Sequence, residues 1–153
     1  MQNTSKQYDE VVSVCRELFE KKIAAYTGAK FAVACVNGTS ALQVSLRLAG
    51  VNQGDEVIIP TITFIAPVNA IAYNGANPVF MDCDYYYNLD AKKTIDFIQN
   101  ETELTNRKSK VTINRKTGKR IAAIIPVHVW GNAALLTRFL LGAKPETLAK
   151  AYH

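Results

Sequence analysis

The residues best suited to bind a ligand lie where apolar runs end. The segment ACVNGTSAL, residues 34–42, stops at Asn37 and Gly38, and two hydroxyl residues then lead into a helical pattern. Gly38 allows close approach of a ligand to the backbone, and the amides of Thr39 and Ser40 would stand at a helix N-terminus, which favours an anion. These groups suit a phosphate. Because Ser, Thr and Gly are also ordinary cap and turn residues, a purely structural role stays open.

Two further turns carry candidate residues. PTITF, the turn after another apolar run, places the aromatic residue Phe64 right after PTIT. A core position at the start of a helix is the better interpretation of this turn taken alone. IPVHVWGNAA places His128 and Trp130 beyond another run. His128 could contact a ligand or only complete the turn. No second His or carboxylate motif accompanies it, so we predict no metal site.

The elements around these turns alternate between helix and strand. A stripe of apolar residues from Val11 to Tyr26 predicts a first helix, with Gly28 as its cap. The later elements are expected as strands near 31–36, 56–60, 78–82 and 121–127, and as helices near 40–49, 64–74 and 90–99. The strands are continuous apolar runs, which is typical of strands covered on both faces. The pattern predicts an α/β fold with a mostly parallel sheet, whose ligands bind beyond the carboxyl ends of the strands.

Composition restricts the class of protein. The chain has 153 residues, is 48% hydrophobic and 20% charged, and so predicts one globular domain. Its apolar runs have strand length, whereas a membrane span needs roughly 20 residues, and no secretory leader opens the sequence. We therefore expect a cytoplasmic protein without membrane contact. Cys15, Cys35 and Cys83 are widely spaced and are expected to be buried, reduced thiols.

The formal net charge of +5 is concentrated in one segment. Seven basic residues and no acidic one lie between Arg107 and Arg120. A phosphate or nucleic-acid patch is one interpretation. The segment has no aromatic residue for base stacking, so a solvated hairpin around Thr117 and Gly118 is favoured, and no nucleic-acid partner is expected. Neither GxGxxG nor a P-loop motif occurs, which argues against a Rossmann-type reductase.

The order of the motifs is more specific than any one of them. FEKKIAAYTGAKFAVACVNGTSAL, GDEVIIPTITFIAPVNAIAYNGANPVFMDCD, NLDAKKTIDFI and IIPVHVWGNAA follow one another along residues 19–134. This succession resembles the amino-terminal part of the sugar-nucleotide aminotransferases of the DegT/DnrJ/StrS type, over about residues 16–134. These are pyridoxal-phosphate enzymes of the aspartate-aminotransferase fold, fold type I. The basic hairpin and NLDAKKTIDFI most resemble the subgroup that aminates UDP-linked 4-keto-6-deoxy sugars.

The resemblance implies a cofactor, substrates and roles for individual residues. Gly38, Thr39 and Ser40 would form the cradle for the phosphate of pyridoxal 5'-phosphate, and Phe64 would stack on its pyridine ring. The implied reaction moves an amino group, commonly from glutamate, to a nucleotide-linked keto-sugar for polysaccharide biosynthesis. Relatives form homodimers with the active site at the subunit interface. The resemblance assigns no role to His128.

The sequence departs from the family after Ala134. No Glu-Asp pair supplies the partner of the pyridinium nitrogen, and no lysine, Lys144 and Lys150 included, lies in the Schiff-base context of the family. We therefore predict no catalytic residue in this chain and no activity by the chain alone. Residues 1–134 would form part of the large domain, and 135–153 a divergent tail consistent with a shifted reading frame, without the carboxy-terminal domain. The alternative is a non-catalytic fragment that acts as a dimerisation or binding module.

Overall fold

The computed structural model describes residues 2–105 and 111–137. The chain divides into two compact units, residues 1–41 and 42–153, and each is described by itself. Within the described residues, no helix is both long enough and apolar enough to cross a membrane.

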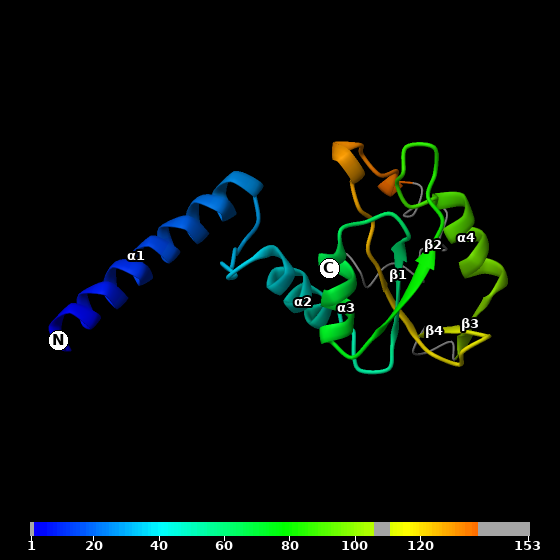
Figure 1. Cartoon of the computed structure of the whole chain (residues 1–153), viewed down its shortest axis with the longest axis horizontal. Helices are drawn as coiled ribbons and strands as arrows, with labels where there is room; N and C mark the ends of the chain where they lie inside the picture. Colours follow the sequence, from blue (N-terminus) through cyan, green and yellow to red (C-terminus); the bar gives the residue numbers. More distant parts are fainter. Residues whose placement is uncertain (1, 106–110, 138–153) are drawn as a thin grey trace. The chain divides into compact units, whose positions relative to one another are not determined.

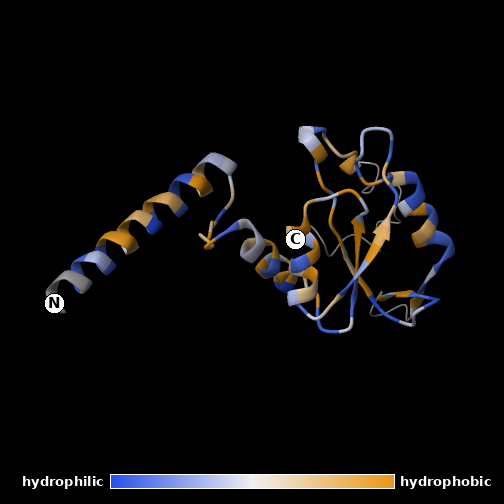
Figure 2. Ribbon diagram, in the orientation of Figure 1, coloured by the Kyte–Doolittle hydropathy of each residue, from blue (hydrophilic) through white to orange (hydrophobic). Residues whose placement is uncertain are grey.

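The first unit is built on a long helix, α1 (Gln2–Thr27). Gly28 follows it with φ of 73°, the left-handed conformation of a helix cap that glycine adopts without strain. Hydrophobic residues recur along the helix between polar ones, as Figure 2 shows. Several of them are exposed: Val11, Leu18, Phe19, Ile23 and Tyr26. The predicted amphipathic helix is therefore confirmed, and its apolar stripe is largely open.

The strand expected at 31–36 is wrong for this structure. These residues run without strand pairing, although the Ala34 amide donates to Glu20 Oε1 at 2.8 Å. Phe31, Val33 and Val36 are 75%, 80% and 87% exposed. A strand forms only where its backbone groups pair with a neighbour, and within residues 2–105 and 111–137 no strand pairs with this segment. The apolar pattern indicates strand propensity without supplying a partner.

The second unit contains the expected parallel sheet (Figure 1). Its strands are β1 (Glu56–Pro60), β2 (Asn77–Met81) and β5 (Ile121–Ile124), in the order β2-β1-β5. Both pairings of β1 are parallel. All five residues of β1 are buried, as expected for the central strand of a sheet covered on both faces.

Helices cover the two faces of this sheet (Figure 1). On one face, Val57 and Ile59 pack with Ile71 of α3 (Ile65–Tyr73) and Leu46 of α2 (Gly38–Leu48). On the other face, Ile58 packs against residues of α4 (Ala91–Asn100) and the turn before it: Leu89, Ala91, Phe97 and Ile98. Alternation along β1 thus sends neighbouring side chains into separate cores. The predicted α/β layering is confirmed.

The hairpin differs from its prediction. The turn before Gly118 exists, with the Gly118 amide donating to Asn114 O at 2.8 Å. However, β4 (Val111–Asn114) pairs along its length with β3 (Thr102–Thr105), and the strand after the turn, β5, joins the parallel sheet. Only a single bridge, Ile113 to Arg120, spans the predicted turn. The short polar β3 has no apolar pattern that would predict it.

The cysteines are free, but two of them are not buried as expected. Cys15 and Cys35 are exposed, and Cys83 is partly buried. Both exposed cysteines belong to the first unit, where the apolar residues of α1 and of 31–36 are also exposed. A thiol in an apolar stripe is buried only where that stripe is covered.

Candidate cofactor site

The first turn of α2 has a different cap from the predicted ones. Asn37 precedes the helix, and its Oδ1 accepts the Ser40 amide at 2.9 Å, while its carbonyl accepts the Ala41 amide at 3.1 Å. Asn37 is therefore the N-cap, with the usual bond to the third helical residue. The Ser40 amide, expected to face an anion, is occupied by this cap.

The remaining groups of this turn still fit a phosphate. The amides of Gly38 and Thr39 precede the first intrahelical donor, so the helix itself does not use them. The hydroxyls of Thr39 and Ser40 are not needed as caps, because Asn37 fills that role. A Cβ built on Gly38 meets no atom within 4 Å, so the backbone there is open to a ligand. Two amides and two hydroxyls at a helix N-terminus form a donor set suited to a dianion.

Phe64 lies in the second unit, at the turn between β1 and α3. It is the N-cap residue of α3, with φ of −67° and ψ of 153°, and its side chain is 80% exposed. The core position favoured for the turn taken alone is therefore wrong, since the aromatic face is open. The neighbouring Thr63 has a buried hydroxyl with no hydrogen-bond partner among the described residues. The exposed ring of Phe64 suits stacking on a planar ligand.

In the third turn, a backbone amide holds the side chain of His128. His128 Nδ1 accepts the Ala134 amide at 2.9 Å, so in the neutral ring the proton lies on Nε2. Residues 129–131 form a short 3-10 turn that leaves Trp130 86% exposed. His128 therefore has a structural role here, and its Nε2 is the atom left for a ligand.

Asn88 fixes this turn, and sequence reasoning missed it. The side chain is 2% exposed; its Oδ1 accepts the Val129 amide at 3.1 Å and its Nδ2 donates to Ala133 O at 3.3 Å. Asn88 lies 41 residues before Val129, so no local spacing signals the contact. The Asn37 cap was also not predicted, although an Asn directly before a helix start is a local signal for it.

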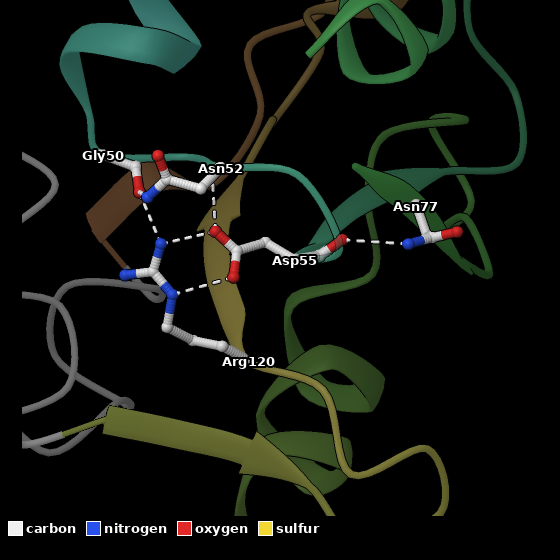
Figure 3. A network of polar contacts seen from close by, with 5 residues as sticks. All are labelled: Gly50, Asn52, Asp55, Asn77 and Arg120. Atoms are coloured by element: carbon white, nitrogen blue, oxygen red, sulfur yellow. Dashed lines mark hydrogen bonds and ion pairs between the residues drawn. The ribbon is translucent and has the colours of Figure 1, made fainter. Parts of the chain in front are cut away.

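Among the described residues, the most buried ion pair lies at the opposite end of the sheet. Asp55, just before β1, accepts hydrogen bonds from Arg120, just before β5, and from the Asn52 amide (Figure 3). Burial alone would raise the pKa of Asp55, but these bonds outweigh it and lower the pKa. The same pairing raises the pKa of Arg120. This cluster joins the amino ends of two strands, and it is structural.

Other charged groups form surface pairs. Lys93 Nζ lies 2.6 Å from Asp82 Oδ2, and this hydrogen bond raises the pKa of Lys93. Among the described residues, no cluster of three or more His, Cys, Asp or Glu could hold a metal ion. Taken separately, the first turn of α2 offers hydrogen-bond donors for an anion, and the turn before α3 offers an exposed aromatic ring.

Comparison with known proteins identifies the family. The model of the DegT/DnrJ/EryC1/StrS aminotransferase family matches residues 14–144. GDP-perosamine synthase of Caulobacter vibrioides is 41% identical over 131 residues, which cover 85% of this chain and 30% of that protein. The dTDP-3-amino-3,6-dideoxy-alpha-D-galactopyranose transaminase of Aneurinibacillus thermoaerophilus is 35% identical and covers 85% and 31%.

Solved structures agree with this assignment. A DegT DnrJ EryC1 StrS aminotransferase from Brucella abortus has a TM-score of 0.67 at 33% identity, covering 90% of this chain and 36% of that one. A putative sugar aminotransferase from Streptococcus pneumoniae in its PLP form has a TM-score of 0.64 at 25% identity, covering 83% and 28%. The chain spans about a third of the length of its relatives. It belongs to the DegT/DnrJ/EryC1/StrS family of pyridoxal-phosphate-dependent aminotransferases.

Proposed function

We propose that this chain supplies part of the cofactor and substrate site of an aminotransferase that acts on a nucleotide-linked keto-sugar in the cytoplasm. The observation that carries the proposal is the family match over residues 14–144. The two relatives described above are named for a GDP-linked and a dTDP-linked sugar. We therefore leave the base open and retain UDP-linked 4-keto-6-deoxy sugars as candidates, with glutamate as the amino donor and a homodimer as the assembly.

In this proposal the residues of the chain bind and orient the cofactor. The hydroxyls of Thr39 and Ser40 and the amides of Gly38 and Thr39 donate hydrogen bonds to its phosphate. The exposed face of Phe64 stacks on its ring. When bound, pyridoxal phosphate supplies the electron sink and carries the amino group. No lysine of this sequence lies in the context expected for covalent attachment, so the chain alone is expected to give no amino transfer from glutamate. Turnover by the purified chain would contradict that expectation.

Binding of pyridoxamine phosphate tests the cofactor site. This form has no aldehyde, so it does not react with surface lysines as pyridoxal phosphate does. The double variant Thr39→Val/Ser40→Ala should weaken binding about a hundredfold or more, because two hydrogen bonds to a charged group are lost and each is worth roughly 1.5–3 kcal/mol. Ser45→Ala, an exposed serine of the same helix, is the matched control and should bind normally. Equal affinity of the double variant and the unaltered chain would reject the phosphate cradle.

Phe64 is tested separately in the same assay. Phe64→Ala should weaken binding several-fold, since it removes the ring that faces the cofactor. Tyr73→Ala removes another exposed aromatic, at the far end of the same helix, and should leave binding unchanged. If both variants lose affinity to the same extent, the effect is not specific to the Phe64 turn.

A second candidate function, a binding module without catalysis, is favoured by the open apolar stripe of α1. Leu18, Phe19 and Tyr26 are 54%, 56% and 90% exposed. An exposed apolar stripe on a 26-residue helix is typical of an interaction surface. Size-exclusion chromatography with and without a full-length relative tests this function. Co-elution would support it, and a monomer unaffected by the relative would reject it.

A further inference from the structure

Two aromatic residues have an unfavourable backbone conformation. Tyr87 and Trp130 have φ of 64° and 54°, and they are the non-glycine residues with positive φ in the described parts of the chain. For bulky side chains this left-handed region is a genuine outlier. Tyr87 is 52% exposed and Trp130 is 86% exposed, so burial of the rings does not offset the strain. Exposed rings on strained backbone indicate a role other than packing.

Hydrogen bonds hold both residues in place. Asp84 Oδ1 accepts the amides of Tyr86 and Asn88 at 2.9 and 3.0 Å, and Asp84 O accepts the Tyr87 amide at 3.0 Å. The buried side chain of Asn88 then bonds both sides of Trp130, at Val129 and Ala133. We call residues 84–88 the tyrosine loop and residues 128–134 the tryptophan turn. Hydrogen bonds from Asn88 therefore connect the tyrosine loop to the tryptophan turn.

Two more rings extend the same loop. Tyr85 and Tyr86 are 91% and 62% exposed, and their rings make an edge-to-face pair with centroids 5.6 Å apart. The loop follows β2 and the tryptophan turn follows β5, so both lie at the carboxyl end of the parallel sheet (Figure 1). This is the edge at which open α/β sheets bind ligands. We name the four residues Tyr85, Tyr86, Tyr87 and Trp130 the aromatic surface.

We propose that the aromatic surface stacks the nucleobase of the nucleotide-linked substrate. This inference rests on the proposed function, which requires such a substrate. Every base has a π-face, so stacking on tyrosine and tryptophan serves guanine, thymine or uracil without reading their edges. The acidic groups nearby are engaged within the protein, Asp84 by backbone amides and Asp82 by Lys93. The surface itself consists of uncharged, exposed rings, which suit an uncharged base.

The sequence provides its own reporter. Trp130 is the single tryptophan of the chain, so intrinsic tryptophan fluorescence reports on this turn alone. The full chain is titrated with GMP, dTMP and UMP, with free N-acetyltryptophanamide as the correction for absorption by the bases. We expect saturable quenching by all three nucleotides and none by ribose 5-phosphate, which lacks a base.

Variants separate stacking from a structural role. Tyr85→Ala should weaken nucleotide binding about tenfold, the usual scale for loss of one stacked ring, whereas Tyr73→Ala on α3 should have no effect. Tyr87→Gly should raise the melting temperature, because glycine adopts positive φ freely, and should also weaken binding. If Tyr87 served only the fold, the substitution would not raise the melting temperature and weaken nucleotide binding at the same time.

Several results would overturn the inference. These are unchanged Trp130 emission with all three nucleotides, equal quenching by ribose 5-phosphate, or full affinity in Tyr85→Ala. Emission that changes with protein concentration instead of nucleotide would assign the surface to self-association and also reject it. Pyridoxamine phosphate binding is measured on the same samples. If the chain binds nucleotides but not pyridoxamine phosphate, the proposed function is rejected and the stacking surface is not. If the chain binds pyridoxamine phosphate but not nucleotides, only the stacking surface is rejected.

Discussion

Replacing Asp55 by Asn should unfold the sheet at lower denaturant concentration. Asp55 is 8% exposed, and its carboxylate accepts the Nε of Arg120 at 2.9 Å and the Asn52 amide at 2.7 Å, with a further bond from Arg120 Nη2. Arg120 also donates to Gly50 O. The pair therefore ties the loop before β1 to the start of β5, as Figure 3 shows.

The expected cost of Asp55→Asn is about 2 kcal/mol of unfolding free energy. An exposed ion pair is worth about 1 kcal/mol or less, and breaking a fully buried one costs roughly 3–5 kcal/mol. The side chains of Asp55 and Arg120 are 11% and 35% exposed, so this pair lies between the two limits. Asp96→Asn is the control, because the Lys92–Asp96 pair is exposed to solvent and its loss should leave the unfolding midpoint almost unchanged.

The pH dependence gives a second, independent readout. The pKa of Asp55 is lowered in the folded chain, so the carboxylate stabilises the fold fully above its unfolded pKa of about 4. That contribution is lost as pH falls through the lower, folded pKa. Urea unfolding followed by circular dichroism should therefore show a difference between the chain and Asp55→Asn that is constant near pH 7 and shrinks below about pH 4. A stability difference that is absent at pH 7, or that is as large below about pH 4 as at pH 7, would refute the reasoning.

Two further predictions concern backbone features. Gly75→Ala should destabilise the chain by about 2–4 kcal/mol, because φ is 70° and the new Cβ would lie 3.0 Å from Gln53 Cγ, whereas Gly54→Ala, with positive φ and open space, should cost only about 1–2 kcal/mol in the same urea titration. Equal costs would show that the contact with Gln53 is relieved freely. Asn37→Ala should lower helix content and cost about 1 kcal/mol through loss of the cap bond to Ser40, and Asn37→Asp should restore it; an unchanged unfolding midpoint in Asn37→Ala would mean that the cap is not needed.

The sequence predicted those parts of the fold that depend on local pattern. The continuous apolar run of β1 required cover on both faces, and Ile58 and Ile59 indeed enter different cores. The parallel pairing followed, because the segments between strands have helical length and period. The order of the motifs along the chain then identified the family, because many local signals in one fixed order are more specific than any single signal.

The errors occurred where structure depends on a distant partner. Residues 31–36 have a strand pattern, but a pattern cannot show whether another strand lies beside them. Cys15 and Cys35 follow the same logic, since burial depends on what covers their elements. Strand β3 was missed for the opposite reason, because its polar sequence gives no signal and its pairing with β4 alone defines it.

The candidate site was predicted by residue type and corrected in its bonding. Thr39, Ser40 and Phe64 were named from turn chemistry and family resemblance, and they remain a proposal. The structure changes the donor set, because Asn37 uses the Ser40 amide and leaves the hydroxyls and the amides of Gly38 and Thr39 for a ligand. A cap that releases hydroxyls from capping is more favourable for anion binding than the serine or threonine cap that the sequence suggested.

The two ends of the parallel sheet of the second unit divide stability from binding. At the amino ends, the polar groups Asp55, Glu56 and Asn114 are buried and hydrogen-bonded, with Asn114 Nδ2 donating to Glu56 Oε2 at 2.8 Å. At the carboxyl ends, Phe64 and Trp130 are exposed, and Trp130 has strained backbone. Strain and exposure are tolerated where the rest of the sheet supplies the stability. Changes at the amino ends should therefore alter unfolding first, and changes at the carboxyl ends should alter ligand binding first.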